Sequence, residues 1–592
     1  MKRLYAMLLI LALLLCGCTR REPQMLAPSK ATLKPQTPEE IAQAEAEIRF
    51  AISLLLDRNY IVERISQAGE QPASSFVAMG MSDHAGQFYE NAGAAEAFYG
   101  YFDTSRSAYH ENFMEAIRIL QKYYDFDGRK FVGFPTVQYI YNTNNKHKAT
   151  AEYVQAALKL VGIPVNLENQ EWNTFLSTRK NGDFTMARSG WVADYTDPIC
   201  FLDMWVSNSG NNDVQLGKGD HGKLKIYSLD LRPYGIDHYV ENGTWAETYD
   251  VLIAQIKACK DPETRYRLLH LAEDMIMSTG CIVPVFFYTD LYMLSPRVDG
   301  FYANPLGYKY FHRTSVDGKG DVLPVCLSSE PESIDPGLNA TVDGATMLSH
   351  LFSGLAKWDM EGERPVIRAD CAASLPEGTQ NPDGTVTYTY TLKENLTWSD
   401  GKDLTAHDFV YAWKRAASAD LGSDYGYLFE VIQGYPNDLA VTAPDDQTLQ
   451  VTLASPISYW NEMLAFPTFF PVRQDVTKNE SWATAAETYI GNGAYTIEAW
   501  KHDSLITLVK NENYHDAASV TMGRIQFYLS DDANNMLTNY KNGDWLLIDD
   551  VPANEIQSLK AAYPNDFRIS GQIGTNYLCF NVNTPLLPQG GS

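Results

Sequence analysis

Cysteine is scarce in this sequence. Eight occur among 592 residues, and no two are spaced as CxxC. Paired CxxC spacing is typical of zinc sites, and dense cysteine patterns are typical of disulfide frameworks, so the sequence predicts neither. One or two bridges would be compatible with an exported protein, but the spacing alone does not pair the cysteines. Two lie in an N-terminal apolar segment, and the other six are scattered: Cys200, Cys259, Cys281, Cys326, Cys371 and Cys579.

Basic residues are also in deficit. Lys and Arg number 47 against 73 Asp and Glu, which gives a formal net charge of −26. Nucleic-acid phosphates and anionic lipid headgroups would be repelled, so we expect no nucleic-acid partner and no flat contact with an anionic bilayer. The HExxH, GxSxG and Walker motifs are missing, and the 11 histidines are dispersed. The sequence therefore predicts no enzymatic activity, no metal site and no cofactor.

Long apolar runs are missing as well. Leu4 to Leu15 is the longest stretch, about a dozen residues, which is too short for a membrane-spanning helix and typical of a secretory signal. It follows Lys2 and Arg3 and ends in Leu-Cys-Gly-Cys, which resembles a bacterial lipobox with cleavage before Cys18 and lipid on its sulfur. An ordinary signal peptide is the alternative. Residues 1–17 are thus predicted to be a lipoprotein signal peptide and 18–36 a flexible tether, placing the protein outside the cell membrane and anchored to it.

Length and local patterns predict a mixed α/β protein of two or three lobes. A chain of 592 residues exceeds what one hydrophobic core usually supports. Thr37-Pro38-Glu39-Glu40 is a typical helix start, and a strand over 165–168 is followed by a helix over 172–180. In the second half, an alternating strand over 385–392 precedes a helix that begins with a capping-box-like Thr405 and Asp408.

Three sequence blocks carry a family resemblance. Residues 392–409 read LKENLTWSDGKDLTAHDF, residues 169–178 read NQEWNTFLST, and residues 187–198 read ARSGWVADYTDP. They resemble the oligopeptide-binding proteins of ABC importers, in the bacterial extracellular solute-binding protein family 5. The resemblance implies an α/β, two-lobed, type II periplasmic-binding-protein-like fold with an extra small lobe.

The blocks stand in the reverse of the family's order. Residues about 37–312 resemble the family's C-terminal half and about 320–589 its N-terminal half, so the resemblance implies one circularly permuted protein, with 314–321 as a linker between the old termini. Three lobes are then expected: a large lobe (37–288, completed by 571–589), a core lobe (289–355 and 490–570) and a small lobe (356–489). A family disulfide beside the motif aspartate is not expected here, because Val192 stands in place of the cysteine.

The resemblance also implies a ligand site centred on Asp194, which matches the aspartate that pairs with a peptide's α-amine. Its neighbours Gly190 and Ala193 are small enough for a peptide backbone to approach closely. Arg188, Arg179 and His147 match positions that meet the peptide's C-terminus, although a surface ion pair would explain each arginine equally well. The other residues implied by the resemblance are Trp191 and Tyr195 in the motif, Trp172 in a side-chain pocket, Thr341 and Val342 in an edge segment that pairs with the ligand backbone, and Tyr425 (or Tyr427) covering the ligand.

The function implied is capture of extended oligopeptides by hinge closure and their delivery to the permease subunits of an ABC importer, by a monomer. Two alternatives stay open. The same fold could bind a dipeptide, a cell-wall peptide, a nickel chelate, haem or an oligosaccharide, because fold alone does not set the ligand. The chain could also be a non-transporting sensor or a rearranged remnant.

Overall fold

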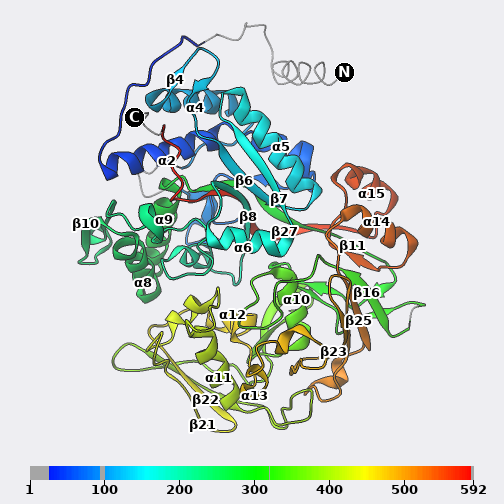
Figure 1. Cartoon of the computed structure of the whole chain (residues 1–592). Coiled ribbons are helices and arrows are strands. Elements are labelled where there is room, and N and C mark those ends of the chain that lie inside the picture. Colours follow the sequence, from blue (N-terminus) through cyan, green and yellow to red (C-terminus); the bar gives the residue numbers. More distant parts are fainter. Residues whose placement is uncertain (1–25, 94–99, 319, 589–592) are drawn as a thin grey trace.

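The computed structural model describes residues 26–93, 100–318 and 320–588. The signal peptide and Cys18 lie outside these residues. We keep the names large, core and small lobe for the residue ranges given above. In Figure 1 the large lobe forms the upper part of the molecule, the small lobe lies at the bottom, and the core lobe extends along the right-hand side between them.

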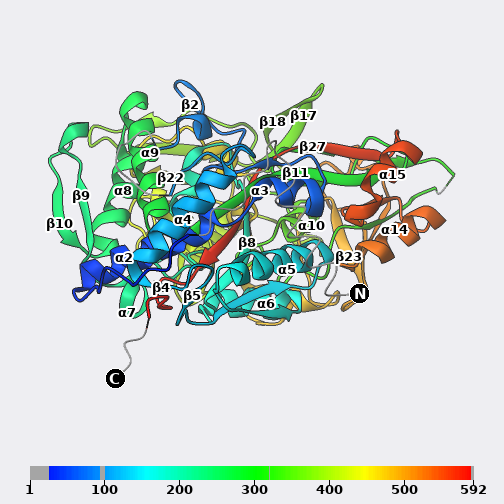
Figure 2. The same cartoon turned by 90° about the horizontal axis from the view of Figure 1, so that it is seen from above.

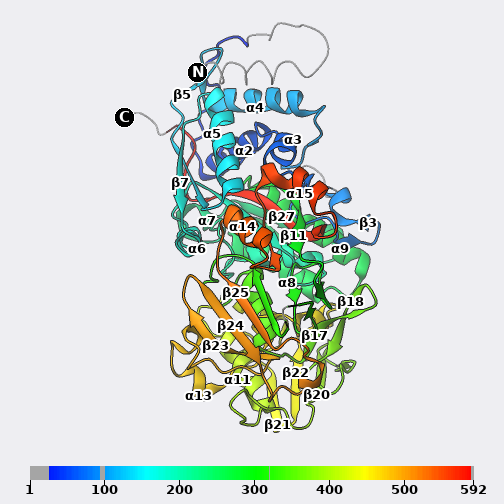
Figure 3. The same cartoon turned by 90° about the vertical axis from the view of Figure 1, so that its right-hand side faces the viewer.

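One long mixed sheet runs through the large and core lobes, which confirms the predicted mixed α/β class. Its core-lobe half is antiparallel at the outer edge and parallel around β16, and its large-lobe half ends in the parallel pair β6 and β7. Figure 3 shows the core-lobe strands below the large lobe. The strand order is β23 (Tyr495–Lys501), β24 (Leu505–Lys510), β25 (Arg524–Tyr528), β16 (Val322–Cys326), β26 (Leu547–Ile548), β11 (Ile282–Leu294), β27 (Phe567–Phe580), β8 (Met186–Val192), β6 (Val137–Asn142) and β7 (Val165–Gln170), with β1 (Gln71–Pro72) beside β11.

Two long strands, β11 and β27, connect the two halves of this sheet. They pair antiparallel from Ile282↔Cys579 in the large lobe to Met293↔Phe567 in the core lobe. The register shifts between Phe287↔Thr575 and Thr289↔Gly571, so residues 572–574 stand opposite Tyr288 outside the ladder. A bulge of this kind locally disrupts the ladder and bends the strand. The two lobes are therefore joined by a strand pair that is interrupted at their boundary.

Helices of the large lobe cover its part of the sheet, as the view from above shows (Figure 2). Thr37 caps the first of them and exchanges hydrogen bonds with Glu40, as the sequence predicted. The predicted strand and helix after Gly162 are also confirmed, as β7 and α6. The helices are α2 (Pro38–Leu54), α3 (Arg58–Tyr60), α4 (Tyr109–Tyr123), α5 (Asn145–Leu160), α6 (Trp172–Asn181), α7 (Gly219–Gly222), α8 (Val251–Ala258) and α9 (Pro262–Ser278). Short hairpins join β2 (Ser82–Asp83) to β3 (Gly86–Gln87), β4 (Asp125–Phe126) to β5 (Phe131–Val132), and β9 (Tyr227–Asp230) to β10 (Tyr239–Gly243).

The small lobe has its own four-stranded sheet, packed on α11 (Ala406–Ala417). The capping box of Thr405 and Asp408 and the strand predicted over 385–392 are both present. Fully buried tryptophans, among them Trp413 and Trp460, fill the space beneath this sheet. Its strands are β19 (Thr379–Gln380), β20 (Val386–Thr391), β22 (Thr448–Leu453) and β21 (Val441–Asp445), beside the hairpin of β17 (Ala356–Glu361) and β18 (Arg364–Ala369) and the helices α12 (Trp460–Met463) and α13 (Gln474–Thr477).

The core lobe contributes three helices: α10 (Val342–Leu351), α14 (Ala533–Asn542) and α15 (Ile556–Ala562). Two short hairpins precede β16, namely β12 (Val298–Asp299) with β15 (Ser315–Val316), and β13 (Tyr302–Ala303) with β14 (Lys309–Tyr310). The predicted linker over 314–321 therefore begins in a strand and then turns into β16.

Part of the predicted tether is bound to the large lobe. Ser29 and Phe126 exchange two backbone hydrogen bonds of 2.9 Å, and Leu33 N–H donates to the carbonyl of Lys122 at 2.8 Å. Lys30 Nζ lies 2.5 Å from an oxygen of Asp125. Over residues 26–33 the prediction of a free tether is therefore wrong, because these backbone groups find partners at the end of α4 and on β4.

The segment after β27 is held by the first helix of the large lobe. The carboxylate of Glu45, on α2, accepts the backbone N–H groups of Leu586 at 2.8 Å and Leu587 at 2.9 Å. The Tyr124 hydroxyl donates to the carbonyl of Leu586. Glu45 is buried, so these contacts are shielded from water and fix the segment against α2.

Candidate functional site

Asp194 lies just beyond the end of β8, at the junction of the large and small lobes. Its side chain is buried, and the Tyr425 hydroxyl donates to its Oδ1 at 3.1 Å. Its second oxygen, Oδ2, is buried and has no hydrogen-bond partner among the described residues, which also offer it no ion pair. Burial raises the pKa of Asp194 well above its usual value; the Tyr425 hydrogen bond opposes the shift, and the charge of Asp203 adds to it. The centre of the site is thus a buried carboxylate with one acceptor oxygen, Oδ2, that has no hydrogen-bond donor among the described residues.

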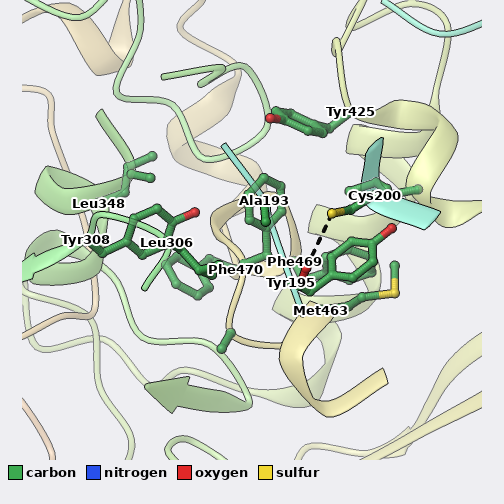
Figure 4. Packing of buried hydrophobic residues seen from close by; sticks show 14 of the residues in the cluster. Ala193, Tyr195, Cys200, Leu306, Tyr308, Leu348, Tyr425, Met463, Phe469 and Phe470 are labelled. Atoms are coloured by element: carbon green, nitrogen blue, oxygen red, sulfur yellow. Dashed lines mark hydrogen bonds between the residues drawn. The ribbon is translucent and has the colours of Figure 1, made fainter. Parts of the chain in front are cut away.

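The other motif residues hold this loop in place. Trp191 Nε1 donates to the carbonyl of Cys200 at 2.9 Å. The ring of Tyr195 stacks on Tyr459 with centroids 4.8 Å apart. Figure 4 shows Ala193 and Tyr195 among buried side chains of the three lobes, with Tyr425 nearby. Trp191 and Tyr195 therefore position Asp194 through packing within the protein.

At Gly190 a larger residue would have to displace a neighbouring side chain. A Cβ there would lie 2.1 Å from the hydroxyl oxygen of Tyr288, the residue opposite the break in the β11–β27 ladder. That oxygen also accepts a hydrogen bond of 3.2 Å from Asn576 Nδ2. In this structure the group that approaches Gly190 closely is the Tyr288 side chain, and the approach of a peptide backbone stays a prediction.

A cavity of about 310 Å³ opens between the large and core lobes beside this break. We call it the main cavity. Its large-lobe wall includes two predicted residues, Arg188 and His147, and its core-lobe wall includes a third, Val342. The remaining lining residues are Ser66, Ala68, Glu70, Tyr139, Asn144, Lys146, Thr150, Phe286, Tyr288, Thr289, Asp290, Leu291, Gly307, Lys309, Asp343, Asp549, Asp550, Gln572, Asn576 and Leu578.

Arg188 is the predicted basic residue that faces the cavity with an uncompensated charge. Its Nε donates to Asn142 Oδ1 at 2.9 Å, and its guanidinium lies 5.7 Å from the rings of both Trp172 and Phe175. No carboxylate pairs with it among the described residues. Burial lowers the pKa of His147 well below its usual value, and the positive charges of Arg188 and Lys146 add to this shift. His147 is therefore neutral beside a permanent cation.

Arg179, which was expected to meet the peptide's C-terminus, lies away from the main cavity. Its Nε lies 2.7 Å from Asp213 Oδ2, its guanidinium covers the ring of Phe175 at 5.1 Å, and it does not line the main cavity. The alternative of an ion pair therefore describes Arg179 in this structure, although the pair is largely buried.

The segment containing Thr341 and Val342 is not an edge strand. Thr341 is the N-cap of α10, and its hydroxyl accepts the backbone N–H of Gly344 at 3.1 Å. Val342 is the first residue of that helix. The segment is therefore a helix start with an extended cap residue, and its predicted pairing with a ligand backbone stays a prediction.

Contacts between lobes hold the molecule in a closed arrangement. Lys146 of the large lobe pairs with Asp550 of the core lobe at 2.6 Å. Glu462 of the small lobe accepts two hydrogen bonds of 2.6 Å from the backbone and hydroxyl of Thr196. Lys257 pairs with Glu430 at 3.3 Å, and Lys180 pairs with Asp424.

The sequence reasoning missed an ionic cluster in the main cavity. Lys309 Nζ lies 3.1 Å from Asp290 and 2.9 Å from Asp549, and Asp343 lines the same space. The one available signal was the pair Asp549-Asp550 directly after the short apolar run of residues 545–548. Lys309 and Asp290 lie on other strands and meet the pair only in the folded structure.

Within the described residues the six cysteines are all free thiols, so no bridge forms to Cys579. No helix of the described part is both long and apolar enough to cross a membrane. Among the same residues, no group of three or more His, Cys, Asp or Glu side chains is arranged to hold a metal ion.

Comparison with known proteins gives a family for this chain. Residues 40–213 and 367–589, together more than half of the chain, match the model of the bacterial extracellular solute-binding proteins, family 5.

Individual relatives match over shorter stretches. The oligopeptide-binding protein OppA of Bacillus subtilis is 33% identical over 261 residues, covering 41% of this chain and 46% of that protein. The dipeptide-binding protein DppE of the same organism is 32% identical, covering 44% and 48%, and the probable deoxycholate-binding periplasmic protein YgiS of Escherichia coli is 32% identical, covering 43% and 49%. The solved structure of Burkholderia pseudomallei OppA matches with 26% identity and a TM-score of 0.38, covering 41% of this chain and 49% of that one.

The chain thus spans about half the length of the curated relatives it matches. The family match rests on both halves of the chain. The chain belongs to the bacterial extracellular solute-binding proteins, family 5.

Proposed function

We propose that this protein captures oligopeptides outside the cell and delivers them to an ABC importer. The observation that carries the proposal is the buried Asp194 carboxylate with its unpartnered Oδ2. Burying an ionised carboxylate is unfavourable unless it is paired. An α-ammonium group at this position would supply the missing partner through a charge-assisted hydrogen bond.

The surroundings of Asp194 suit the rest of a peptide. β8 leads from Asp194 to Arg188 on the wall of the main cavity, and an unpaired guanidinium there suits a carboxylate. Two matched relatives carry names for oligopeptide and dipeptide binding, which supports a peptide ligand for this chain as well.

Ligand capture would require Tyr425 and Tyr288 to move. The Tyr425 hydroxyl now occupies one acceptor position of Asp194, and Tyr288 covers Gly190. Both would be displaced if the lobes opened at the break between β11 and β27, since Tyr425 belongs to the small lobe and Tyr288 lies at the break. Hinge opening and closure around the ligand is the mechanism we propose.

We also propose that the chain is a circularly permuted member of its family. The family model matches both halves of the chain, whereas each curated relative aligns over about half of its own length, as expected when the halves are exchanged. The buried contacts of Glu45 with Leu586 and Leu587 support this, because they hold together two segments that would be neighbours in the family's order.

If the chain is permuted, a variant with its halves in the family's order should fold and bind peptides as this chain does. Joining residue 589 to residue 37 and opening the chain within 314–321 should give a protein that melts cooperatively and binds the same peptides, because nearly all packing contacts of residues 37–588 are retained. Calorimetry on both chains would check this. A reordered chain that fails to fold, or that loses binding, would contradict the permutation.

Lipid anchoring through Cys18 is a further part of the proposal, supported by the lipobox-like sequence. Cys18→Ser should shift the protein from the membrane fraction to the medium or periplasm, because the tether would lose its acyl chains. Fractionation and mass spectrometry of the mature N-terminus would show this. Unchanged membrane retention, or cleavage elsewhere, would argue for an ordinary signal peptide.

Peptides with a free amine should raise the melting temperature of the mature protein. A ligand at a hundred times its dissociation constant adds about 2.7 kcal/mol to the free energy of unfolding. The same tri- to pentapeptides should not raise the melting temperature when they are N-acetylated, because acetylation removes the charge that pairs with Asp194. Asp194→Asn should abolish the shift, whereas Asp183→Asn, which alters an exposed acid of the same lobe, should retain it. Equal shifts with acetylated peptides would refute the role of Asp194, and no shift with either pool would refute the peptide ligand.

Asp194 should also make the ligand-free protein less stable at neutral pH. Its folded pKa is raised, so between the ordinary carboxyl pKa, about 3.9, and the raised value the folded state binds more protons than the unfolded state. Stability therefore falls as pH rises through this window and stays lower above it. Asp194→Asn should be more stable than the wild type above the window by roughly 1–3 kcal/mol, with no difference below the ordinary pKa. Melting curves across pH would test this, and a difference that does not change with pH would contradict it.

A further inference from the structure

Negative charge exceeds positive charge in the main cavity. Five carboxylates line it against three permanent cations, and His147 is neutral. The carboxylates are Glu70, Asp290, Asp343, Asp549 and Asp550, and the cations are Lys146, Arg188 and Lys309. Lys146 is already paired with Asp550. The imbalance therefore concentrates on the core-lobe wall around Lys309.

Lys309 is shared by more carboxylates than it can neutralise. Its ammonium lies 3.1 Å from Asp290 Oδ1 and 2.9 Å from Asp549 Oδ1, and its side chain is only 2% exposed. Asp343, in the first turn of α10, faces the same cavity. Three buried or half-buried carboxylates thus surround one ammonium group.

Two observations show that this charge is not satisfied within the protein. The Asp290 side chain is 9% exposed, and its Oδ2 is buried without a hydrogen-bond partner among the described residues. Burial raises the pKa of Asp343 and of Asp549, and the charge of Asp290 adds to both shifts while Lys309 opposes them. Both observations indicate that a second cation beside these carboxylates would be electrostatically stabilised.

The position of the cluster fits a ligand held by its amine at Asp194. Arg188 precedes Asp194 by six residues, so a strand's rise of ~3.3 Å per residue places the cavity wall ~20 Å from the amine. Asn576, which also lines the cavity, pairs with Gly190, four residues before Asp194 and therefore ~13 Å away by the same rise. Both distances are upper limits for the cavity wall, because β8 ends at Val192, and a long side chain from the third residue onward can span the shorter of them.

We propose that the main cavity receives a cationic side chain of the bound peptide, an ammonium or guanidinium group, against Asp343 and the free oxygen of Asp290. This inference rests on the proposed function and narrows its substrate class to peptides with a basic residue beyond the second position. The neutral or acidic side chains of other peptides would leave the cluster uncompensated, and a buried charge without a partner is costly.

The test is isothermal calorimetry of the whole mature protein with alanine pentapeptides that carry one substitution. At each of positions 2 to 5, lysine is compared with norleucine, which has the same chain without the charge, and with glutamate. At one position or more from the third onward, lysine should bind roughly tenfold tighter than norleucine or better, and glutamate should bind more weakly than either.

A variant and its matched control locate the effect. Asp343→Asn should reduce the ratio of lysine to norleucine affinity severalfold, without releasing Lys309 from Asp290 and Asp549. Asp544→Asn removes one charge from an exposed residue of the same lobe that does not line the cavity, and it should leave the ratio unchanged.

The remaining outcomes separate this inference from the proposed function. Equal affinity for lysine and norleucine at every position, with free-amine peptides still preferred over acetylated ones, would overturn the cationic pocket and leave the peptide function standing. A lysine preference that Asp343→Asn does not change would also overturn it. Binding of none of the peptides would overturn both proposals.

Discussion

The pairing of β11 with β27 is the constraint on which the rest of the structure depends. These strands pass through both halves of the main sheet, and their ladder has two register shifts, one between Pro284 and Phe286 and a wider one opposite Tyr288. At that break the backbone of residues 572–574 is released from the ladder and serves the site: Ile573 accepts the N–H of Ala193, next to Asp194. Gln572 lines the main cavity. The break between the lobes therefore lies beside both the main cavity and Asp194, as the proposed function requires.

Uncompensated negative charge is the second organising feature. A protein selected only for stability would pair or remove Asp194 and would not gather three carboxylates around Lys309. In the proposed function, these carboxylates lower the stability of the ligand-free state, and binding of a cationic group would restore it, so that the ligand would favour the closed form. The interlobe contacts suit this role. Pairs such as Lys180 with Asp424 are partly exposed, and such pairs contribute little, so the lobes can separate again.

Local sequence signals predicted helices and strands well, but they do not indicate which distant side chains contact one another in the folded protein. The capping boxes at Thr37 and Thr405 and the strand over 165–168 depend on neighbouring residues, so the sequence alone indicates them. Asp194 was found because its motif is a family signature. The partners of Arg179 and Lys309 come from distant segments, as does the hydroxyl of Tyr288 over Gly190, and no spacing rule relates them. Thr341 is the N-cap of α10, a local role that the following residues set and that the family position does not indicate.

Chain order has a limited influence on a fold of this kind. Exchanging two halves leaves every packing contact available, and the entropy of closing a loop grows only with the logarithm of its length. What permutation removes is a covalent link at one place, and the segment there must be held by other contacts. The buried carboxylate of Glu45, which accepts N–H groups of Leu586 and Leu587, together with the hydroxyl of Tyr124, fulfils this requirement. Since the adjoining strand is β27, these contacts also hold the end of one of the two connecting strands, so the proposed hinge motion would not depend on which residue begins the chain.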